Sequence, residues 1–301
     1  MHLESSFDLH FSAQEFGTAA VFAKGELFQT VKNAGTEATN VMCMDAVDGC
    51  VRLQFQLGAS LELPYPNYPN CQDLCVDCDG NILVAQQERI DAFSTDGVLL
   101  RTIFLPKGLT FACCLCAADS RLGMLVYDTE FEFAVLILEA ATGAVIDIFV
   151  AESERICFSD IRSLHLVGPV VVAVIMEFVE DVMDDDDEVD GTILRAIPMV
   201  LLPRAYEFAL GGNMSACAAL SDLKKDDIVN FDASLNCWVV LGSNTMRRVD
   251  CAGGVRLQVS MPPSFVADAN ATVLTSEGKV VLLAGSLEAC EIRNVRVYAL
   301  L

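Results

Sequence analysis

Five aspartates recur at similar points along the chain and could together bind a metal ion. The first three follow one another at steps of 42 and 41 residues. Carboxylate oxygens from several repeats, brought to one central opening, would suit a divalent cation that polarises a carbonyl group or activates water. Aspartate also caps tight turns, which is the simpler interpretation. The candidates are Asp77, Asp119, Asp160, Asp232 and Asp268.

The most acidic stretch lies near residues 177–191, between apolar runs at 170–179 and 192–202. We expect an extended hairpin insertion whose carboxylates repel one another and stay in solvent. It is either a solvated loop or a docking surface for a basic partner. An EF-hand is disfavoured, because Ile197 stands where a calcium loop needs a bidentate Glu. The expected partner-binding residues are Glu180, Asp181, Asp184, Asp185, Asp186, Asp187, Glu188 and Asp190.

Thirteen cysteines raise the possibility of a thiolate metal site. The pairs Cys75–Cys78 and Cys113–Cys116 each have the two-residue spacing found in four-thiolate zinc sites. Neighbouring residues of a strand point to opposite faces, however, and a free cysteine packs well in a core. Core packing is therefore the main expectation. The odd number of cysteines, without a signal peptide, favours a reduced cytoplasmic setting.

Nucleophilic catalysis has little support in the sequence. The only histidines are His2, His10 and His165, so a catalytic triad would depend on His165. We place His2 and His10 in a mobile segment and His165 just before a buried strand. There is no nucleophile elbow and no glycine-rich phosphate loop. We assign no catalytic residue and no resident cofactor, apart from the possible divalent cation.

The composition excludes several classes of partner. The chain has 301 residues, of which 53% are hydrophobic, and a formal net charge of −23. A phosphate backbone would be repelled by that charge, so we expect no nucleic-acid binding. The most apolar run, residues 166–176, is too short to cross a bilayer and is rich in valine, which predicts a buried strand. We expect no membrane partner, and the oligomeric state stays open.

Short apolar runs separated by turn residues predict an all-β fold. Four strands are expected in residues 74–106, at 74–76, 82–85, 89–93 and 98–105. Similar units follow, with a period near 40 residues. One four-stranded unit cannot bury both its faces, whereas a ring of such units can, so the period predicts a β-propeller. We expect one domain over residues 1–301, with seven blades favoured by the spacing and six as the alternative.

Closure of this ring is expected to come from the two ends of the chain. The hypothesis ties residues 7–31 to residues 265–301. One step in the series is too long for a single regular blade, since Asp160 and Asp232 are 72 residues apart. It predicts either two short blades or one blade with insertions.

One unit resembles a known repeat family. Residues 74–85, LCVDCDGNILVA, followed by RIDAFSTDG at 89–97, are similar to an NHL repeat. The unit around residues 141–146 looks more like blades of quinoprotein-type propellers. The resemblance implies a propeller that acts as an interaction platform, and a minority of such propellers are lactonases or lyases. Some NHL propellers bind RNA through a basic face, which the net charge of −23 argues against here.

Two functions follow as hypotheses. The first is a non-enzymatic scaffold that binds a basic protein or peptide, indicated by the net charge and the acidic stretch. The alternative is a metal-dependent, lactonase-like hydrolase or lyase that uses acidic residues at the central opening. Whether the protein is an enzyme stays open at this point, and the first hypothesis is preferred.

Overall fold

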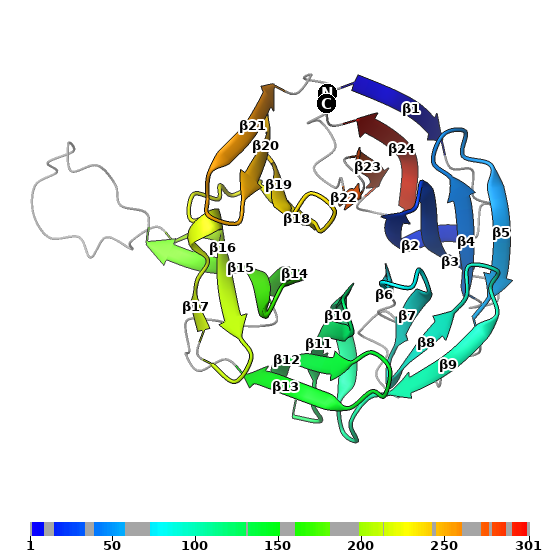
Figure 1. Ribbon diagram of the computed structural model, residues 1–301, viewed down its shortest axis with the longest axis horizontal. Helices are drawn as coiled ribbons and strands as arrows, with labels where there is room; N and C mark the ends of the chain where they lie inside the picture. The colour runs from blue at the N-terminus through cyan, green and yellow to red at the C-terminus, as the bar shows by residue number, and fades with distance from the viewer. Residues whose placement is uncertain are drawn as a thin grey trace, which may run out of the picture.

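The computed structural model forms a ring of antiparallel β-sheets around a central opening (Figure 1). It describes residues 2–8, 15–33, 39–57, 73–130, 132–150, 160–180, 199–212, 214–242, 245–260, 272–276, 279–286 and 291–299. These residues contain six sheets of four strands each. The expected all-β propeller is therefore confirmed. In the part of the chain described, no helix has the length and apolar character needed to cross a membrane.

Each sheet is one blade, and we number the blades I to VI in chain order. Blades I to V each use four consecutive strands, the first innermost and the fourth outermost. Blade I holds β2 (Glu15–Ala23), β3 (Glu26–Asn33), β4 (Thr39–Asp45) and β5 (Val51–Gln56). Blade II holds β6 (Asp73–Val76), β7 (Ile82–Gln86), β8 (Arg89–Phe93) and β9 (Leu99–Phe104). Blade III holds β10 (Thr110–Ala118), β11 (Arg121–Tyr127), β12 (Phe133–Glu139) and β13 (Val145–Val150).

The remaining blades complete the ring. Blade IV holds β14 (Ile161–Val167), β15 (Val170–Glu180), β16 (Met199–Ala209) and β17 (Met214–Ala216). A short 3-10 helix, η2 (Ala218–Leu220), leads to blade V, which holds β18 (Ile228–Asp232), β19 (Cys237–Leu241), β20 (Thr245–Asp250) and β21 (Val255–Ser260). Blade VI holds β22 (Thr272–Ser276), β23 (Lys279–Ser286), β24 (Glu291–Ala299) and the N-terminal strand β1 (His2–Asp8).

The hydrophobic core lies between the blades. Each pair of neighbouring blades shares one cluster of buried apolar side chains among the described residues. Strand β7 shows how the sequence produces this arrangement. Ile82 and Val84 pack toward blade I, whereas Leu83 and Ala85 pack toward blade III. Because side chains alternate along a strand, a fully apolar strand serves two interfaces at once.

The four strands expected in residues 74–106 are confirmed as β6 to β9. The turn between β6 and β7 is tight because Gly80 adopts a left-handed φ of 89° that glycine tolerates without strain. The Oδ1 atom of Asp77 accepts hydrogen bonds from the backbone N–H groups of Asp79 and Asn81, at 3.0 and 2.8 Å. This aspartate therefore caps the turn that its sequence context predicts.

The favoured count of seven blades is wrong, because the described residues form six four-stranded sheets. The 72 residues between Asp160 and Asp232 span blade IV and only the first strand of blade V. Blade IV is long because β15 and β16 each have 11 residues and are joined through residues 181–198. Of the two alternatives for this step, one blade with an insertion is therefore confirmed and two short blades are not.

The third strand of blade IV also differs from expectation. It was predicted at 192–202, ending before Pro203, but β16 runs from Met199 to Ala209. Pro203 lies opposite Met176 of β15. On its other side β16 pairs with β17 only at residues 206–208. Proline lacks an N–H donor and is tolerated in a strand where one side has no neighbouring strand, as is the case for β16 at this position.

The ring closes through its two terminal segments, but with different residues from those expected. Strand β1 pairs with β24, from His2 opposite Ala299 to Asp8 opposite Asn294. The N and C termini lie side by side (Figure 1). Residues 15–31, which the hypothesis tied to the C-terminus, belong instead to β2 and β3 of blade I. His2 is in a strand rather than in a mobile segment, and His10 lies outside the described residues.

Candidate functional site

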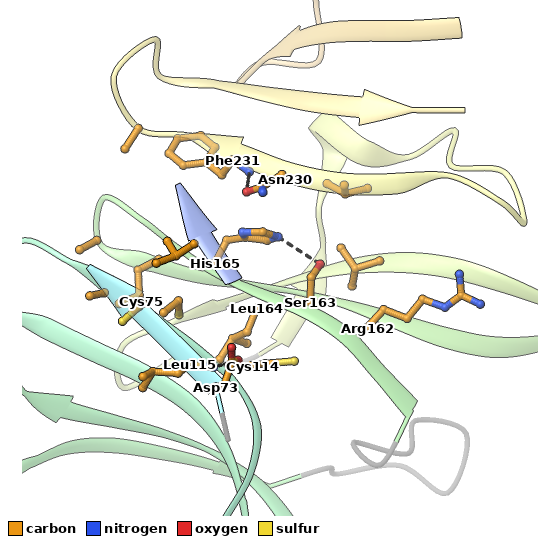
Figure 2. A pocket seen from close by; sticks show the side chains of 18 of the residues that line it. Asp73, Cys75, Cys114, Leu115, Arg162, Ser163, Leu164, His165, Asn230 and Phe231 are labelled. Carbon is orange, nitrogen blue, oxygen red and sulfur yellow. Dashed lines mark hydrogen bonds between the residues drawn. The ribbon is translucent and has the colours of Figure 1, made fainter. Parts of the chain in front are cut away.

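A cavity of about 620 Å³ opens at the centre of the ring. Its walls come from the innermost strands β2, β6, β10, β14 and β18 and from the residues beside them. Figure 2 shows these strands converging, with polar side chains among apolar ones. Its labelled polar and thiol-bearing residues are Asp73, Cys75, Cys114, Arg162, Ser163, His165 and Asn230.

Asp73, the first residue of β6, holds blades II and III together. Its Oδ1 atom accepts a hydrogen bond from the backbone N–H of Leu74 at 2.9 Å. Its Oδ2 atom accepts one from the backbone N–H of Leu115 in β10 at 2.8 Å. Burial raises the pKa of Asp73 to about 6, against these hydrogen bonds, which lower it. This carboxyl group therefore changes its protonation state close to neutral pH.

Beside Asp73, two adjacent thiols face each other in β10. The Sγ atoms of Cys113 and Cys114 are 3.4 Å apart. Cys114 lines the cavity. Alternation in β10 had been expected to send neighbouring side chains to opposite faces. That expectation is wrong at this point, because the pairing of β10 with β11 shifts register on both sides of Cys113.

The opposite wall carries a buried imidazole. His165 lies within β14, not before it as expected, and its Nε2 atom is 3.0 Å from the Oγ atom of Ser163 (Figure 2). Its ring meets the ring of Trp238 edge to face, with centroids 5.5 Å apart. Burial lowers the pKa of His165 to about 4, so the imidazole is neutral at pH 7 and is too weak a base to activate Ser163 effectively.

Strand β18 adds groups whose hydrogen-bonding capacity is largely taken up within the fold. Asp227, just before this strand, accepts from the backbone N–H of Lys224 and pairs with Arg247, both at 3.0 Å. The Oδ1 atom of Asn230 accepts from the backbone N–H of Phe231 at 2.8 Å. The cavity lining thus combines the carboxyl groups of Asp73 and Asp227, the guanidinium group of Arg162, a neutral imidazole and thiols with apolar side chains.

The metal candidates do not share one place. Every blade begins with its innermost strand, so these strands run the same way through the ring. Asp77 and Asp119 come directly after β6 and β10, and Asp232 ends β18, which places them on one face of the ring, the exit face. Asp160 directly precedes β14 and so lies on the other face, the entry face. Asp268 lies outside the described residues.

Hydrogen bonds within turns occupy two of these aspartates. Asp232 is fully buried, and its Oδ1 atom accepts from the backbone N–H of Ser234 at 2.9 Å and from its hydroxyl group at 2.6 Å. Asp77 caps its own turn and also lies 3.8 Å from Arg101. Asp119 is exposed beside Arg121. Among the residues described, no three His, Cys, Asp or Glu side chains are grouped as metal ligands.

The two cysteine pairs likewise form no four-thiolate group among the residues described. Cys78 is exposed and donates to the backbone oxygen of Asp119 at 3.0 Å, whereas Cys116 donates to the backbone oxygen of Gly123 at 3.4 Å. Cys75 packs in the core between blades II and III, as expected. The ten cysteines that the structure describes are all free thiols.

The acidic stretch is only partly covered by the described residues. Strands β15 and β16 pair as far as Glu180 opposite Met199, so the chain leaves and re-enters blade IV at one end of the hairpin. The other expected partner-binding residues lie outside the described residues: Asp181, Asp184, Asp185, Asp186, Asp187, Glu188 and Asp190. Glu177, within β15, accepts a hydrogen bond from the hydroxyl group of Tyr206.

Sequence reasoning missed Asp73 and Ser163. A signal for Asp73 was available, because acidic residues stand at or just before the starts of β6, β14 and β18, as Asp73, Asp160 and Asp227. Ser163 had no signal of its own. It faces the same cavity as His165 because the two are two residues apart on one strand.

The comparisons with known proteins agree with the fold and add no family. No family model and no curated protein matches the chain. Among solved structures, hydrazine synthase from Kuenenia stuttgartiensis aligns with a TM-score of 0.52 at 12% identity, over 97% of each chain. The Pan2 WD40 domain from Neurospora crassa aligns with a TM-score of 0.51 at 12% identity, over 99% of this chain and 94% of that one. At such identity the similarity extends to the β-propeller fold alone.

Proposed function

We propose that this propeller is a non-enzymatic scaffold that binds a basic protein or peptide through its entry face. The entry face holds the starts of the innermost strands and, because strands alternate in direction, every turn between the second and third strands of a blade. The turn between β11 and β12 in blade III and the end of the β15–β16 hairpin in blade IV both lie there. Blades III and IV are neighbours, so these two turns are adjacent on the ring.

The observation that carries the proposal is the charge of these adjacent turns. The β11–β12 turn presents Glu130 and Glu132 to solvent, while Asp128 accepts their backbone N–H groups at 2.8 and 3.1 Å. None of these three carboxylates forms an ion pair with another described residue. The β15–β16 connection, residues 181–198, adds seven acidic residues in sequence. Glu130 and Glu132, which form no ion pair with another described residue, would attract lysine and arginine side chains, and the acidic sequence of the neighbouring connection would add to that attraction.

At several other points on the ring, acidic groups have cationic partners within the fold. Arg52 pairs with Glu26 and Asp45, and Arg256 pairs with Asp250 at 2.6 Å. Exposed pairs of this kind add little stability, but they offset charge locally. Much of the net charge of −23 therefore belongs to carboxylates without such partners, and these can attract a basic ligand.

Binding of a fluorescein-labelled lysine-rich peptide of about ten residues, followed by anisotropy at low and high salt, tests this proposal. Asp184–Asp187→Asn and the pair Glu130→Gln, Glu132→Gln should each weaken binding at least about fivefold. The matched control is Asp96→Asn with Asp119→Asn, which removes two charges from the exit face and should change affinity less than twofold. Salt should weaken the wild-type complex strongly.

Two results would overturn the proposal. Absence of peptide binding at low salt would exclude an electrostatic docking surface. Equal weakening by the entry-face and exit-face variants would show that only total charge matters, without a site on the entry face.

Two narrower assignments accompany this function as proposals. An NHL-like character is supported by blade II, where the Asp77–Asn81 turn has the capping expected of that repeat. A cytoplasmic setting is supported by the free thiols of the described cysteines. The hydrolase alternative has no comparable support, because Asp77 and Asp232 already accept turn hydrogen bonds and Asp160 is on the other face.

A further inference from the structure

The local geometry of β10 brings together two thiols that a regular strand would separate. In an ordinary strand, adjacent side chains point to opposite faces. Here the pairing register with β11 shifts between Phe111 and Cys113 and again between Cys113 and Cys116. Cys114 adopts a left-handed φ of 63°, which a side chain other than glycine rarely does. The two shifts and this backbone conformation place the Sγ atoms 3.4 Å apart.

The two thiols are also partly exposed, and their pKa values are shifted in opposite directions. Cys114 lines the central cavity, and both side chains are partly exposed. The thiol of Cys114 donates a hydrogen bond to the sulfur of Cys113. This hydrogen bond lowers the pKa of Cys113 and raises that of Cys114. By contrast, burial raises the pKa of Cys116 to about 12. Because the thiolate is the nucleophile, Cys113 is the reactive member of the pair.

We propose that Cys113 and Cys114 form an oxidation site on the cavity wall, at which hydrogen peroxide converts the two thiols into a vicinal disulfide. The Cys113 thiolate attacks one peroxide oxygen, the O–O bond breaks, and the departing hydroxide takes a proton to become water. Cys113 is then a sulfenic acid. The Cys114 sulfur attacks the sulfenic sulfur, an S–S bond forms, and the leaving hydroxide takes the Cys114 proton as a second water. Two thiols lose two electrons, and one peroxide gains them.

The bond formed in this way should be readily reversible. Adjacent Cα atoms are about 3.8 Å apart across a trans peptide, whereas ordinary disulfides join Cα atoms about 4.4 to 6.8 Å apart. A disulfide between neighbours is therefore strained, and strained disulfides are the more easily reduced ones. Its formation would also pull on Leu115, whose backbone N–H is bound to Asp73 across the interface between blades II and III. Oxidation would thus change the cavity wall and that interface together.

Peroxide treatment followed by alkylation and mass spectrometry tests the proposal on the full chain. Chymotrypsin cuts after Phe111 and Leu115, which isolates the pair from Cys116. After treatment with a few equivalents of peroxide, the 112–115 peptide should lack two hydrogens and take up no N-ethylmaleimide. Dithiothreitol should restore two reactive thiols. In the untreated protein, phenylarsine oxide, which requires two neighbouring thiols, should bind with one-to-one stoichiometry.

Single variants separate the two roles and guard against misfolding. In Cys114→Ser, Cys113 should stop at the sulfenic acid, which dimedone traps; in Cys113→Ser, Cys114 should stay a free thiol. Both variants should lose phenylarsine oxide binding. The exposed-thiol variant Cys50→Ser with Cys78→Ser is the matched control and should oxidise at positions 113 and 114 like the wild type. The proposal is overturned if peroxide oxidises Cys50 and Cys78 while Cys113 and Cys114 still alkylate, or if Cys113→Ser retains phenylarsine oxide binding.

Discussion

The two walls of the central cavity are built alike but hold their polar groups in opposite ways. On the β6–β10 wall, Asp73 is an acid whose pKa burial raises to about 6, so it stays neutral at pH values below that. On the β14–β18 wall, His165 is a base whose pKa burial lowers to about 4, so it stays neutral at pH values above that. The same desolvation therefore produces opposite dependences of stability on pH. Burial therefore favours the uncharged form of one titratable group on each wall.

The walls also differ in what packs behind them, and this gives the largest expected effect. Trp238, 2% exposed, packs against His165 behind one wall, whereas the smaller Cys75 is part of the other wall and packs into the core between blades II and III. Trp238→Ala should lower the free energy of unfolding by about 3 to 5 kcal/mol, because it leaves a large cavity between blades IV and V. Cys75→Ala should cost about 1 kcal/mol. Urea denaturation of both variants measures the difference, and similar losses would contradict it.

The next effect comes from His165. Its pKa falls from an ordinary 6.5 to about 4 in the folded protein. Between these values the unfolded chain binds a proton that the folded chain does not, so stability decreases as the pH falls. From pH 7 to pH 5, the free energy of unfolding of the wild type should fall by about 2 kcal/mol more than that of His165→Asn. Urea denaturation of both proteins at several pH values measures this, and parallel pH curves would show that His165 is protonated equally in both states.

Asp73 should show a smaller effect of opposite sign. Its pKa rises from 3.8 to about 6, so the folded chain keeps a proton that the unfolded chain has lost. Stability should therefore decrease as the pH rises from 5 to 7, by about 1 kcal/mol relative to Asp73→Asn. The same denaturation series provides the measurement. A wild type that gains stability over this range, relative to the variant, would contradict the sign.

The smallest effect is expected at position 114, where the backbone of β10 differs from that of β6. Glycine tolerates the left-handed conformation that Cys114 adopts, so Cys114→Gly should relieve backbone strain. The variant also loses the contacts of the cysteine side chain. Because these two effects oppose each other, the free energy of unfolding should change by less than about 1 kcal/mol. Cys75 lies in a regular, buried part of β6. Cys75→Gly should therefore cost about 2 kcal/mol. Thermal melts of the two variants compare them directly, and a larger loss at position 114 would refute the argument.

The fold was predictable from sequence wherever strand length and turn chemistry agreed. Blade II follows its pattern closely, because the apolar runs are short and glycine and aspartate mark its turns. Blade IV did not follow the expectation. Its two long strands and the intervening 181–198 disturbed the period, and its third strand runs from Met199 to Ala209 rather than over 192–202. Blade count depends on such interruptions, which local patterns do not resolve.

The site was less predictable, because it depends on register and on strand ends. The aspartates were recognised as turn residues, but residue spacing alone did not separate Asp160, on the entry face, from Asp77 on the exit face. The contact between Cys113 and Cys114 arises from register shifts against β11, which involve residues of another strand. Alternation along a single strand predicts the opposite arrangement.

The closing strand has a consequence for biosynthesis. His2 pairs with Ala299, so strand β1 must wait until β24, the last of the described strands, has been synthesised. Contacts of such sequence separation form slowly, and a strand that waits unpaired can associate with other chains. The segment HLESSFD carries two carboxylates, Glu4 and Asp8, and Glu4 later forms an ion pair with Lys279 at 2.9 Å. Charged side chains keep the unpaired strand soluble during this delay. They also disfavour its pairing with another chain before it can pair with β24 of its own chain.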